Sequence, residues 1–542
     1  MTNLDWTVIG VYLFGLVAFA AVQARRQRSL WDYYLAGRRV PWWQSGMSTM
    51  ATQLGAISFV SAPAFVALKP NGGLKWLCYE FGVPLGILLV LIWIIPRLHR
   101  GNHISIYEYL EERFDAGTRS LVSLLFQLGR GLATAVSVLA GGLILSTALP
   151  LSTTSAILLI GVVTIVYDAL GGMRVVLVSD VAQMLIIMLG IGVCGVTALK
   201  LVGWAAAVDA LGPERWRILD FGRWGLTSGG EYGFWPMTIG GIFLYASYYG
   251  CDQSQVQREL SVAKLSDVKR SLLFNAFGRF PVVLFYCVMG VLVGAVFTMP
   301  EQMSHVAWRF GMDIDLLSST LQDNPDRMVP MFILTFLPAG VVGLVFVAIM
   351  SALMSSLDSA INSLSAATMQ DFYRRYARRD ATERHYMIVS KLLTVFWGGF
   401  CVLAALVFAN SAEAARQTTI VLINAVGSLL YGPILAAFLV GVATRLVSGG
   451  AMKIGIVLGI AVNVVLWQTT DVSWLWWNFV GFAVATVSSI GLQVLRAPEG
   501  WRSLEDMFRP GLGALEAVRG RTSVFGYTLL IIVVAYGLQQ MG

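Results

Sequence analysis

The segment at residues 348–371 reads AIMSALMSSLDSAINSLSAATMQD and places a row of serines in a helix whose beginning is purely apolar. On a period of 3.6 residues, one stripe of this helix presents side-chain and main-chain oxygens to the interior of a bundle. The stripe consists of Ala352, Ser355, Ser356, Ser359 and Ser363. Hydroxyls at this depth serve either a dehydrated cation or close helix packing with hydrogen bonds between helices. The segment alone favours neither.

The composition is that of an all-α protein that crosses the membrane many times. Of 542 residues, 57% are hydrophobic and 13% are charged, and the mean hydropathy is +0.70. Apolar runs predict about fourteen transmembrane helices. Examples are residues 6–22, 84–95, 156–167, 181–202, 284–297, 392–408 and 525–536. No basic segment precedes the first run and no small-residue cleavage site follows it, so we expect a retained helix rather than a signal peptide.

Lysine and arginine are unequally shared between alternate loops, at roughly 26 in one set and 9 in the other. Because basic loops stay in the cytoplasm, the N-terminus is expected outside. With about fourteen spans, the C-terminus is expected outside too. The net charge of +7 therefore indicates topology and not nucleic-acid binding. We expect a multi-pass protein of the cell membrane, in contact with the lipid bilayer and without an evident protein partner.

Other residue patterns argue against enzymes and pumps. The five cysteines lie in or beside apolar runs without regular spacing, which disfavours a disulfide framework. The four histidines lie in loops and form no metal-binding or hydrolytic motif. No Walker sequence is present, so ATP-driven pumping is disfavoured.

Two spans are interrupted by polar residues and glycine. The span at residues 45–68 contains Gln53, Gly55, Ser58 and Pro63, and the span at residues 234–258 contains GGIFLYASYYGCDQSQVQR. Interrupted helices at matching places in two halves are typical of inverted-repeat transporters. We therefore predict a single transporter domain over residues 1–542. It comprises a leading helix and first cytoplasmic loop (1–43), a first repeat (44–203), a second repeat (233–442) and accessory helices (450–542).

Five strings occur in an order and spacing that resemble the sodium:solute symporter family, which includes sodium/sugar, proline, iodide and sialic acid cotransporters. They are WDYYLAGRR (31–39), YEYLEERF (107–114), GGMRVVLVSDVAQ (171–183), DQSQVQRELS (252–261) and MSSLDSAINSLSAATMQDFY (354–373). The resemblance implies a leucine-transporter-like core of five plus five helices with flanking helices. It also implies sodium-coupled uptake of a small solute by alternating access, without covalent chemistry.

The same resemblance implies a sodium site between the first broken helix and the serine helix. Its ligands would be the carbonyls of Ala51, Leu54 and Ala352 and the hydroxyls of Ser355 and Ser356. Several neutral oxygens are what a monovalent cation needs when it leaves water.

In some relatives an aspartate that matches Asp180 forms a second sodium site with serines, here Ser355 and Ser359. Asp358 stands where those relatives carry a hydroxyl, which is a departure from the family pattern. An alternative for Asp180 is an ion pair with Arg174 or another basic residue.

Two charged residues inside spans predict how the solute is recognised. Glu80 matches a glutamate that accepts sugar hydroxyls in the galactose relatives. Arg130 lies near the midplane and matches an arginine that holds the substrate carboxylate in the sialic acid relatives. For Arg130, a structural ion pair is the alternative.

Further substrate candidates are Gln53, Ser58, Tyr248 and Asn424. Tyr248 matches an aromatic residue that closes under the sugar in the galactose relatives, but Ser58 and Tyr245 replace amide side chains of those relatives. The sequence favours a sugar or polyol as the solute and keeps a carboxylate or sugar acid as the alternative. Proton coupling, through Asp180, Asp358 or Glu80, and a channel are further alternatives.

Overall fold

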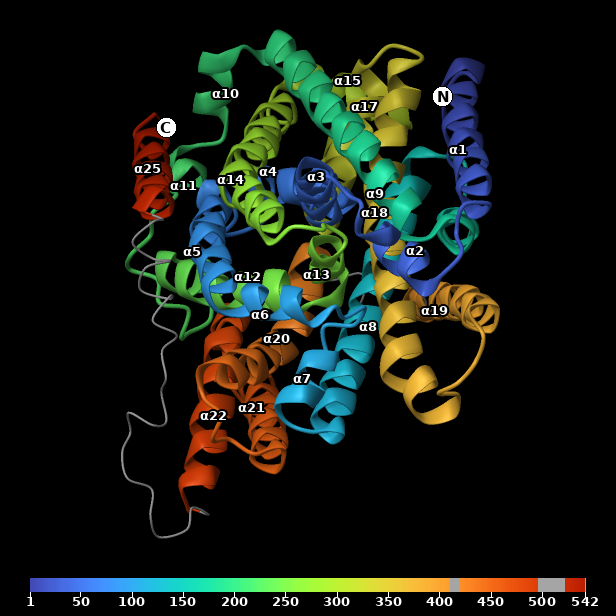
Figure 1. Cartoon of the computed structure of the whole chain (residues 1–542). Helices are drawn as coiled ribbons and strands as arrows, with labels where there is room; N and C mark the ends of the chain where they lie inside the picture. Colours follow the sequence, from blue (N-terminus) through green and yellow to red (C-terminus); the bar gives the residue numbers. More distant parts are fainter. Residues whose placement is uncertain (410–418, 496–521, 542) are drawn as a thin grey trace.

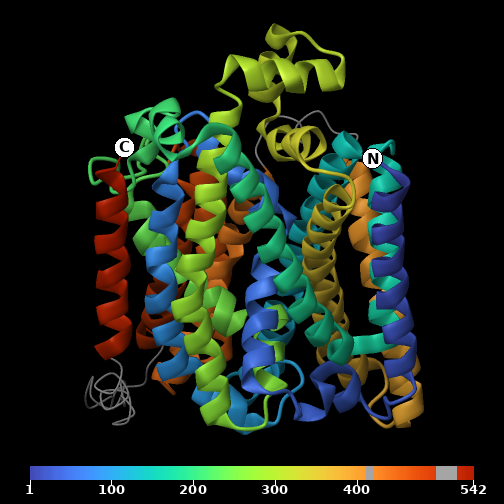
Figure 2. The same cartoon turned by 90° about the horizontal axis from the view of Figure 1, so that it is seen from above.

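The computed structural model describes residues 1–409, 419–495 and 522–541, and the side chains of residues 56, 57, 148 and 419–425 lie outside this description. Throughout the described residues the regular structure is helical, without a strand. Figure 1 labels the individual elements, and Figure 2 shows that the long helices run side by side as a bundle. Both marked termini lie at the same end of the bundle in Figure 2, as an even number of crossings requires.

Eleven described helices are long and apolar enough to cross a membrane. They are α1 (Asn3–Ala24), the run from η2 (Leu74–Phe81) through α5 (Gly82–Leu89), η3 (Val90–Ile94) and α6 (Ile95–Leu98) to η4 (His99–Gly101), α8 (Ala116–Ala148), α9 (Thr153–Val202), α14 (Leu265–Val296), α18 (Val341–Ala367) with η7 (Thr368–Ala377), α19 (Glu383–Ala409), α20 (Thr419–Ala443), α21 (Gly449–Thr469), α22 (Trp474–Leu495) and α25 (Thr522–Gln539).

Helix α9 is long enough for two crossings. Its 50 residues would extend about 75 Å at 1.5 Å per residue, whereas the hydrocarbon core is about 30 Å thick. Gly172 breaks it with φ 56° and ψ −162°. A Cβ at Gly172 would also lie 2.7 Å from the carbonyl oxygen of Tyr33, so both the backbone conformation and the close approach require glycine.

The two predicted broken spans are present. In the first, α3 (Trp42–Gln53) and α4 (Ala56–Ala67) meet at Leu54 and Gly55 with a bend of 52°. In the second, η5 (Pro236–Gly240) and α12 (Gly241–Cys251) are separated from α13 (Gln253–Leu260) by Asp252. The first broken span brings the candidate crossings among the described residues to twelve. The two further crossings that the sequence predicts would come from the second broken span and from the second half of α9. Figure 1 shows α3 and α13 near the middle of the bundle.

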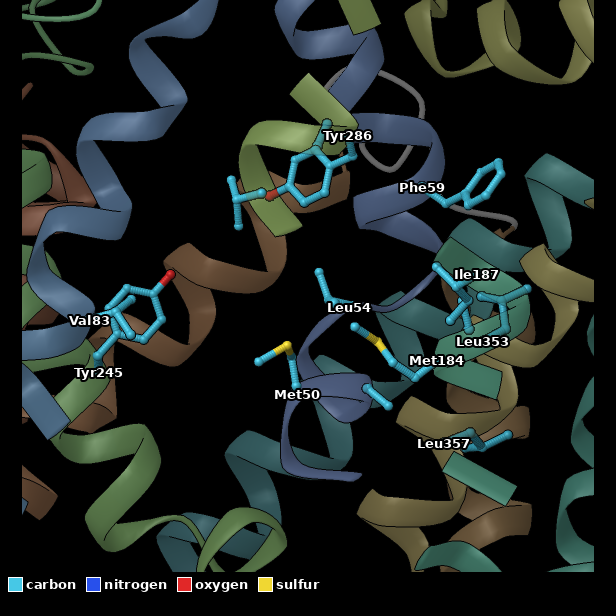
Figure 3. Packing of buried hydrophobic residues seen from close by; sticks show 14 of the residues in the cluster. Met50, Leu54, Phe59, Val83, Met184, Ile187, Tyr245, Tyr286, Leu353 and Leu357 are labelled. Atoms are coloured by element: carbon cyan, nitrogen blue, oxygen red, sulfur yellow. The ribbon is translucent and has the colours of Figure 1, made fainter. Parts of the chain in front are cut away.

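Apolar packing fixes the first break. Leu54 is 1% exposed, and Figure 3 shows it among Met50, Met184 and Leu353, which come from α3, α9 and α18. Inside a membrane such contacts stabilise by van der Waals packing, because the lipid tails are as apolar as these side chains. The break is therefore held by side chains from both neighbouring helices.

The leading helix fixes the start of the serine helix α18. Asp5 of α1 accepts hydrogen bonds from the backbone N–H groups of Gly340 and Gly343, at 2.7 and 2.8 Å. A carboxylate at a helix N-terminus satisfies free N–H groups and interacts favourably with the helix dipole. A Cβ at Gly343 would lie 2.6 Å from the Cα of Asp5, so this contact needs glycine.

Candidate functional site

The serine helix lies directly against the first break. The hydroxyl of Ser356 is 3.3 Å from the carbonyl oxygens of both Thr52 and Ala352. A Cβ on Gly55 would come within 2.9 Å of the same hydroxyl. Thr52 was not predicted, although it follows Ala51 directly. The structure therefore brings oxygens of α18 and of the broken helix together, as a sodium site requires.

The carbonyls expected to bind sodium lie at this break. Ala51 is the last residue but two of α3, and its carbonyl accepts the N–H of Leu54 at 3.1 Å. Ala51, Ala352 and Ser355 are all fully buried.

Asp180 is paired with Arg258 and not with Arg174. The distance from Nη2 of Arg258 to Oδ2 of Asp180 is 3.0 Å, and both side chains are about fully buried, at 1% and 0% exposed. Ser355 donates to Oδ1 of Asp180 at 2.5 Å, and Ser48 donates to Oδ2. Arg258 also donates to the hydroxyl of Ser359. The residues expected at a second sodium site are thus gathered around a guanidinium.

The sequence analysis did not single out Arg258, although it quoted the string that contains it. Arg258 follows Gln257 on the inner half of the second broken helix, and an arginine in a membrane helix needs a partner. That rule identifies the residue as important, but it gives no indication that its partner is Asp180.

Asp358 lies beside this cluster. Tyr167 donates to its Oδ2 at 2.5 Å and Ser359 lies 3.1 Å from its Oδ1. In the described part of the chain, no lysine, arginine or histidine forms an ion pair with Asp358. Asp358 therefore places a buried carboxyl group next to Ser359.

A cavity of about 150 Å³ lies next to the sodium region, and Ser356 lines it. It is lined by polar and aromatic residues from several helices: Thr52, Gln53, Gly55, Ser58, Trp76, Tyr79, Arg130, Ala133, Thr134, Ser137, Leu244, Tyr245, Tyr248, Arg279, Tyr286, Ser356 and Tyr431. These described lining residues include two arginines and no carboxylate. A solute in this cavity would therefore lie beside Ser356, one of the residues expected from the sequence to bind sodium.

Arg130 both lines the cavity and is loosely paired. Its Nη1 is 3.6 Å from Oδ2 of Asp252 and 3.4 Å from the hydroxyl of Tyr248, and its guanidinium lies 5.6 Å from the centre of the Tyr248 ring. Its Nε has no hydrogen-bond partner among the described residues. Both alternatives considered for Arg130, solute contact and structural pairing, are thus compatible with its position.

Glu80 is not among the residues that line the cavity in the described structure. It forms an ion pair with Nε of Arg279 at 2.7 Å and accepts a hydrogen bond from Tyr245 at 3.0 Å. Arg279, which the sequence analysis missed, lines the cavity instead and lies over the ring of Tyr245 at 5.0 Å. Its Nη1 has no partner within the described part of the chain. Its place inside the span α14 was the available sequence signal.

The remaining substrate candidates are distributed as follows. Gln53, Ser58 and Tyr248 line the cavity, and Gln53 accepts a hydrogen bond from Tyr249 at 3.0 Å. Asn424 belongs to α20, but its side chain lies outside the described residues.

Outside the membrane-spanning helices, Asp326 contacts α4, the second half of the first broken helix. It lies in η6 (Pro325–Arg327) and accepts a hydrogen bond from Ser61 of α4 at 2.9 Å. Burial raises the pKa of Asp326 to about 6, although the hydrogen bond from Ser61 and the charge of Lys69 act in the opposite direction. Asp326 therefore titrates close to neutral pH.

A helical membrane bundle with two broken helices and a polar cavity beside one break is the architecture of a secondary transporter. The chain belongs to the sodium:solute symporter family, whose model matches residues 33–459. It is thus a sodium-coupled, multi-pass membrane symporter of a small solute.

Named relatives span most of the chain. The sodium/sialic acid symporter NanT of Aliivibrio fischeri is 28% identical over 90% of this chain and 92% of its own length. The human sodium/iodide cotransporter is 28% identical over 85% of this chain and 69% of its own length. The sodium/glucose cotransporter of Vibrio parahaemolyticus is 26% identical, with coverages of 85% and 84%.

The fold is similar to that of a solved sodium-coupled sialic acid symporter in a substrate-bound, outward-open state. The TM-score is 0.78 at 24% identity, over 92% of this chain and 99% of the other. The expected leucine-transporter-like fold class is confirmed.

Proposed function

We propose that this symporter takes up a small organic acid together with sodium, and that Arg130 and Arg279 recognise the acid. The observation that carries the proposal is the lining of the cavity, which includes two guanidinium groups and, among its described residues, no carboxylate. Each guanidinium has an N–H group that finds no partner among the described residues, namely Nε of Arg130 and Nη1 of Arg279. A guanidinium only donates hydrogen bonds and an ionised carboxylate only accepts them, so the two are complementary.

Similarity to named relatives supports the same class of solute. Besides the sialic acid symporters, human sodium-coupled monocarboxylate transporter 1 is 26% identical to this chain over 81% of it. These names concern proteins that carry acids.

For the coupling ion, we propose that sodium binds at the break of the first broken helix. The ligands would be the carbonyl oxygens of Ala51, Leu54 and Ala352 and the hydroxyls of Ser355 and Ser356. The position of Ser356 on the wall of the solute cavity supports direct cooperation between sodium and solute.

We propose the same division into repeats as the sequence analysis. The two repeats would be residues 44–203 and 233–442, with accessory helices over 450–542. The N- and C-termini would both lie outside the cell. Both termini lie at the same end of the bundle in Figure 2, which supports their location on the same side of the membrane.

A neutral sugar or polyol is the second candidate. The sodium/glucose relative favours it, as do the hydroxyls of Ser58, Thr134 and Ser137 along the cavity. A polyol also needs acceptors for its own O–H groups, however, and the arginines offer none.

Thermal unfolding of the purified protein distinguishes the two candidates. The probes are sialic acid, pyruvate and glucuronate against glucose, galactose and inositol, each in sodium and in choline. A ligand at 100 times its Kd stabilises by about 2.7 kcal/mol, which is readily seen as a higher Tm. We expect stabilisation by at least one acid in sodium only. Stabilisation by the neutral sugars alone would overturn the acid proposal in favour of the polyol.

A further inference from the structure

Arg130 separates the central cavity from a smaller inner one. The inner cavity has a volume of about 20 Å³, close to that of a single water molecule, and Asp252 lines it together with Arg130 and Tyr431. Arg130 and Tyr431 also line the central cavity. The guanidinium of Arg130 is therefore within reach of a solute on one side and of Asp252 on the other.

The two carboxylate oxygens of Asp252 have different partners. Its Oδ1 accepts hydrogen bonds from the backbone N–H and the hydroxyl of Ser254, at 2.7 and 2.6 Å, and so caps the start of α13. Its Oδ2 faces Nη1 of Arg130 at 3.6 Å, which is longer than a hydrogen bond. The cap is tight and the ion pair is loose, so a second carboxylate can draw Arg130 away from Asp252 at little cost.

Helix α13 connects this hinge to the sodium region. All eight of its residues are buried. Arg258, six residues or about 9 Å along the helix from Asp252, pairs with Asp180, which in turn accepts the hydroxyl of Ser355 at 2.5 Å.

A neighbouring side chain of α13 forms a hydrogen bond with α18. Gln257 donates to the side-chain oxygen of Asn362 at 2.8 Å. A buried helix whose hydrogen bonds and ion pairs reach both regions is a contiguous connection through which two sites can be coupled.

We propose that Asp252 couples the solute to sodium by releasing Arg130 to the solute carboxylate, while α13 transmits the change to Asp180 and Ser355. The proposal rests on the proposed acid substrate. Asp252 competes with the solute for Arg130. It acts as a positioning residue, because in this proposal it contacts neither the transported sodium ion nor the solute. When the solute leaves, Arg130 returns to Asp252, which makes this pair the inner barrier of the cavity.

The test replaces Asp252 by asparagine. Asn caps a helix as well as Asp does, so Asp252→Asn preserves the start of α13 while it removes the charge that faces Arg130. Asp267→Asn is the matched control, because Asp267 forms an ion pair with its exposed neighbour Arg270 near the start of α14, away from Arg130. The probe is the acid that stabilises the wild-type protein best, and its Kd is measured with and without sodium by isothermal titration.

Sodium should tighten acid binding in the wild-type protein by about fivefold or more, within the usual range of coupling between two sites. In Asp252→Asn the acid should bind about fivefold more tightly without sodium, and the factor due to sodium should fall toward one. By reciprocity, the acid should also lose its effect on the sodium affinity. Asp267→Asn should behave as the wild type.

An unchanged sodium factor together with an unchanged acid affinity in Asp252→Asn would overturn the coupling role while leaving acid recognition intact. The coupling role would also be overturned if Asp252→Asn tightened acid binding by the same factor in the Arg130→Gln background as in the wild-type background, because the effect would then not depend on Arg130. If no acid binds the wild-type protein, the proposed function fails, and the coupling role fails with it.

Discussion

Replacement of Arg130 by lysine tests acid recognition most directly. Lysine keeps the positive charge but loses the planar fork and the Nε–H donor, which has no partner among the described residues. A carboxylate that takes two parallel bonds from arginine would take one from lysine. A hydrogen bond to a charged group contributes about 1.5–3 kcal/mol, and 1.4 kcal/mol is a factor of ten. We therefore expect the Kd for the acid to rise about 10- to 100-fold.

The measurement is a binding isotherm for the best acid in saturating sodium, with purified Arg130→Lys and the wild type side by side. Arg97→Lys is the matched control, since Arg97 donates to the carbonyl of Trp93 and is not among the residues that line the cavity. Its acid affinity should stay within about twofold of the wild-type value, below the energy of one hydrogen bond.

The companion variant is Glu80→Gln, whose effect on solute affinity differs between an acid and a polyol. For an acid, the loss of Glu80 leaves Arg279 without its carboxylate partner, so acid affinity should not fall. For a polyol that Glu80 binds directly, affinity should fall about tenfold or more. Intact binding in Arg130→Lys together with collapse in Glu80→Gln would refute the acid mechanism.

Three other outcomes follow from the geometry. Ser355→Ala or Ser356→Ala should raise the sodium concentration for half-maximal uptake about tenfold without loss of the fold, and normal sodium activation in both variants would contradict the site. Asp180→Asn should destabilise by about 3–5 kcal/mol, because it leaves Arg258 buried without its carboxylate, and an unchanged Tm would contradict this. The raised pKa of Asp326 means that its contribution to stability is present below about pH 4 and is lost as the pH rises through 6, so Asp326→Asn should flatten the pH dependence of Tm in that window. An unchanged slope would refute that assignment.

Local features around the first break could be read from the sequence. Gly55 and the serines of α18 stand out because polar residues and glycine are rare inside membrane helices, and each is visible within a single span. Most of the apolar runs were also predictable as transmembrane helices, since bilayer thickness sets the length that a crossing needs. The two halves of α9 form one continuous helical segment in the structure, and Gly172 marks the boundary between them.

Partners from distant spans could not be predicted in the same way. Arg258 and Asp180 are 78 positions apart, and Glu80 and Arg279 are 199 apart. Each of these charged groups demanded a partner inside the membrane, but the choice depends on how the helices pack. The sequence therefore indicated Glu80 as a solute contact, whereas the structure places its carboxylate against Arg279 and puts the guanidinium on the cavity wall.

The position of Arg258 leads to an expectation for the number of sodium ions. Asp180, Ser355 and Ser359, which a second sodium would need, already surround this fixed cation, and a second positive charge beside it would be repelled. With one sodium per monovalent acid, uptake would move no net charge. In proteoliposomes with a potassium gradient and valinomycin, we therefore expect an imposed membrane potential to leave the initial uptake rate unchanged. Uptake that accelerates with an inside-negative potential would show that a further cation enters with each acid, and that Arg258 gives way to it.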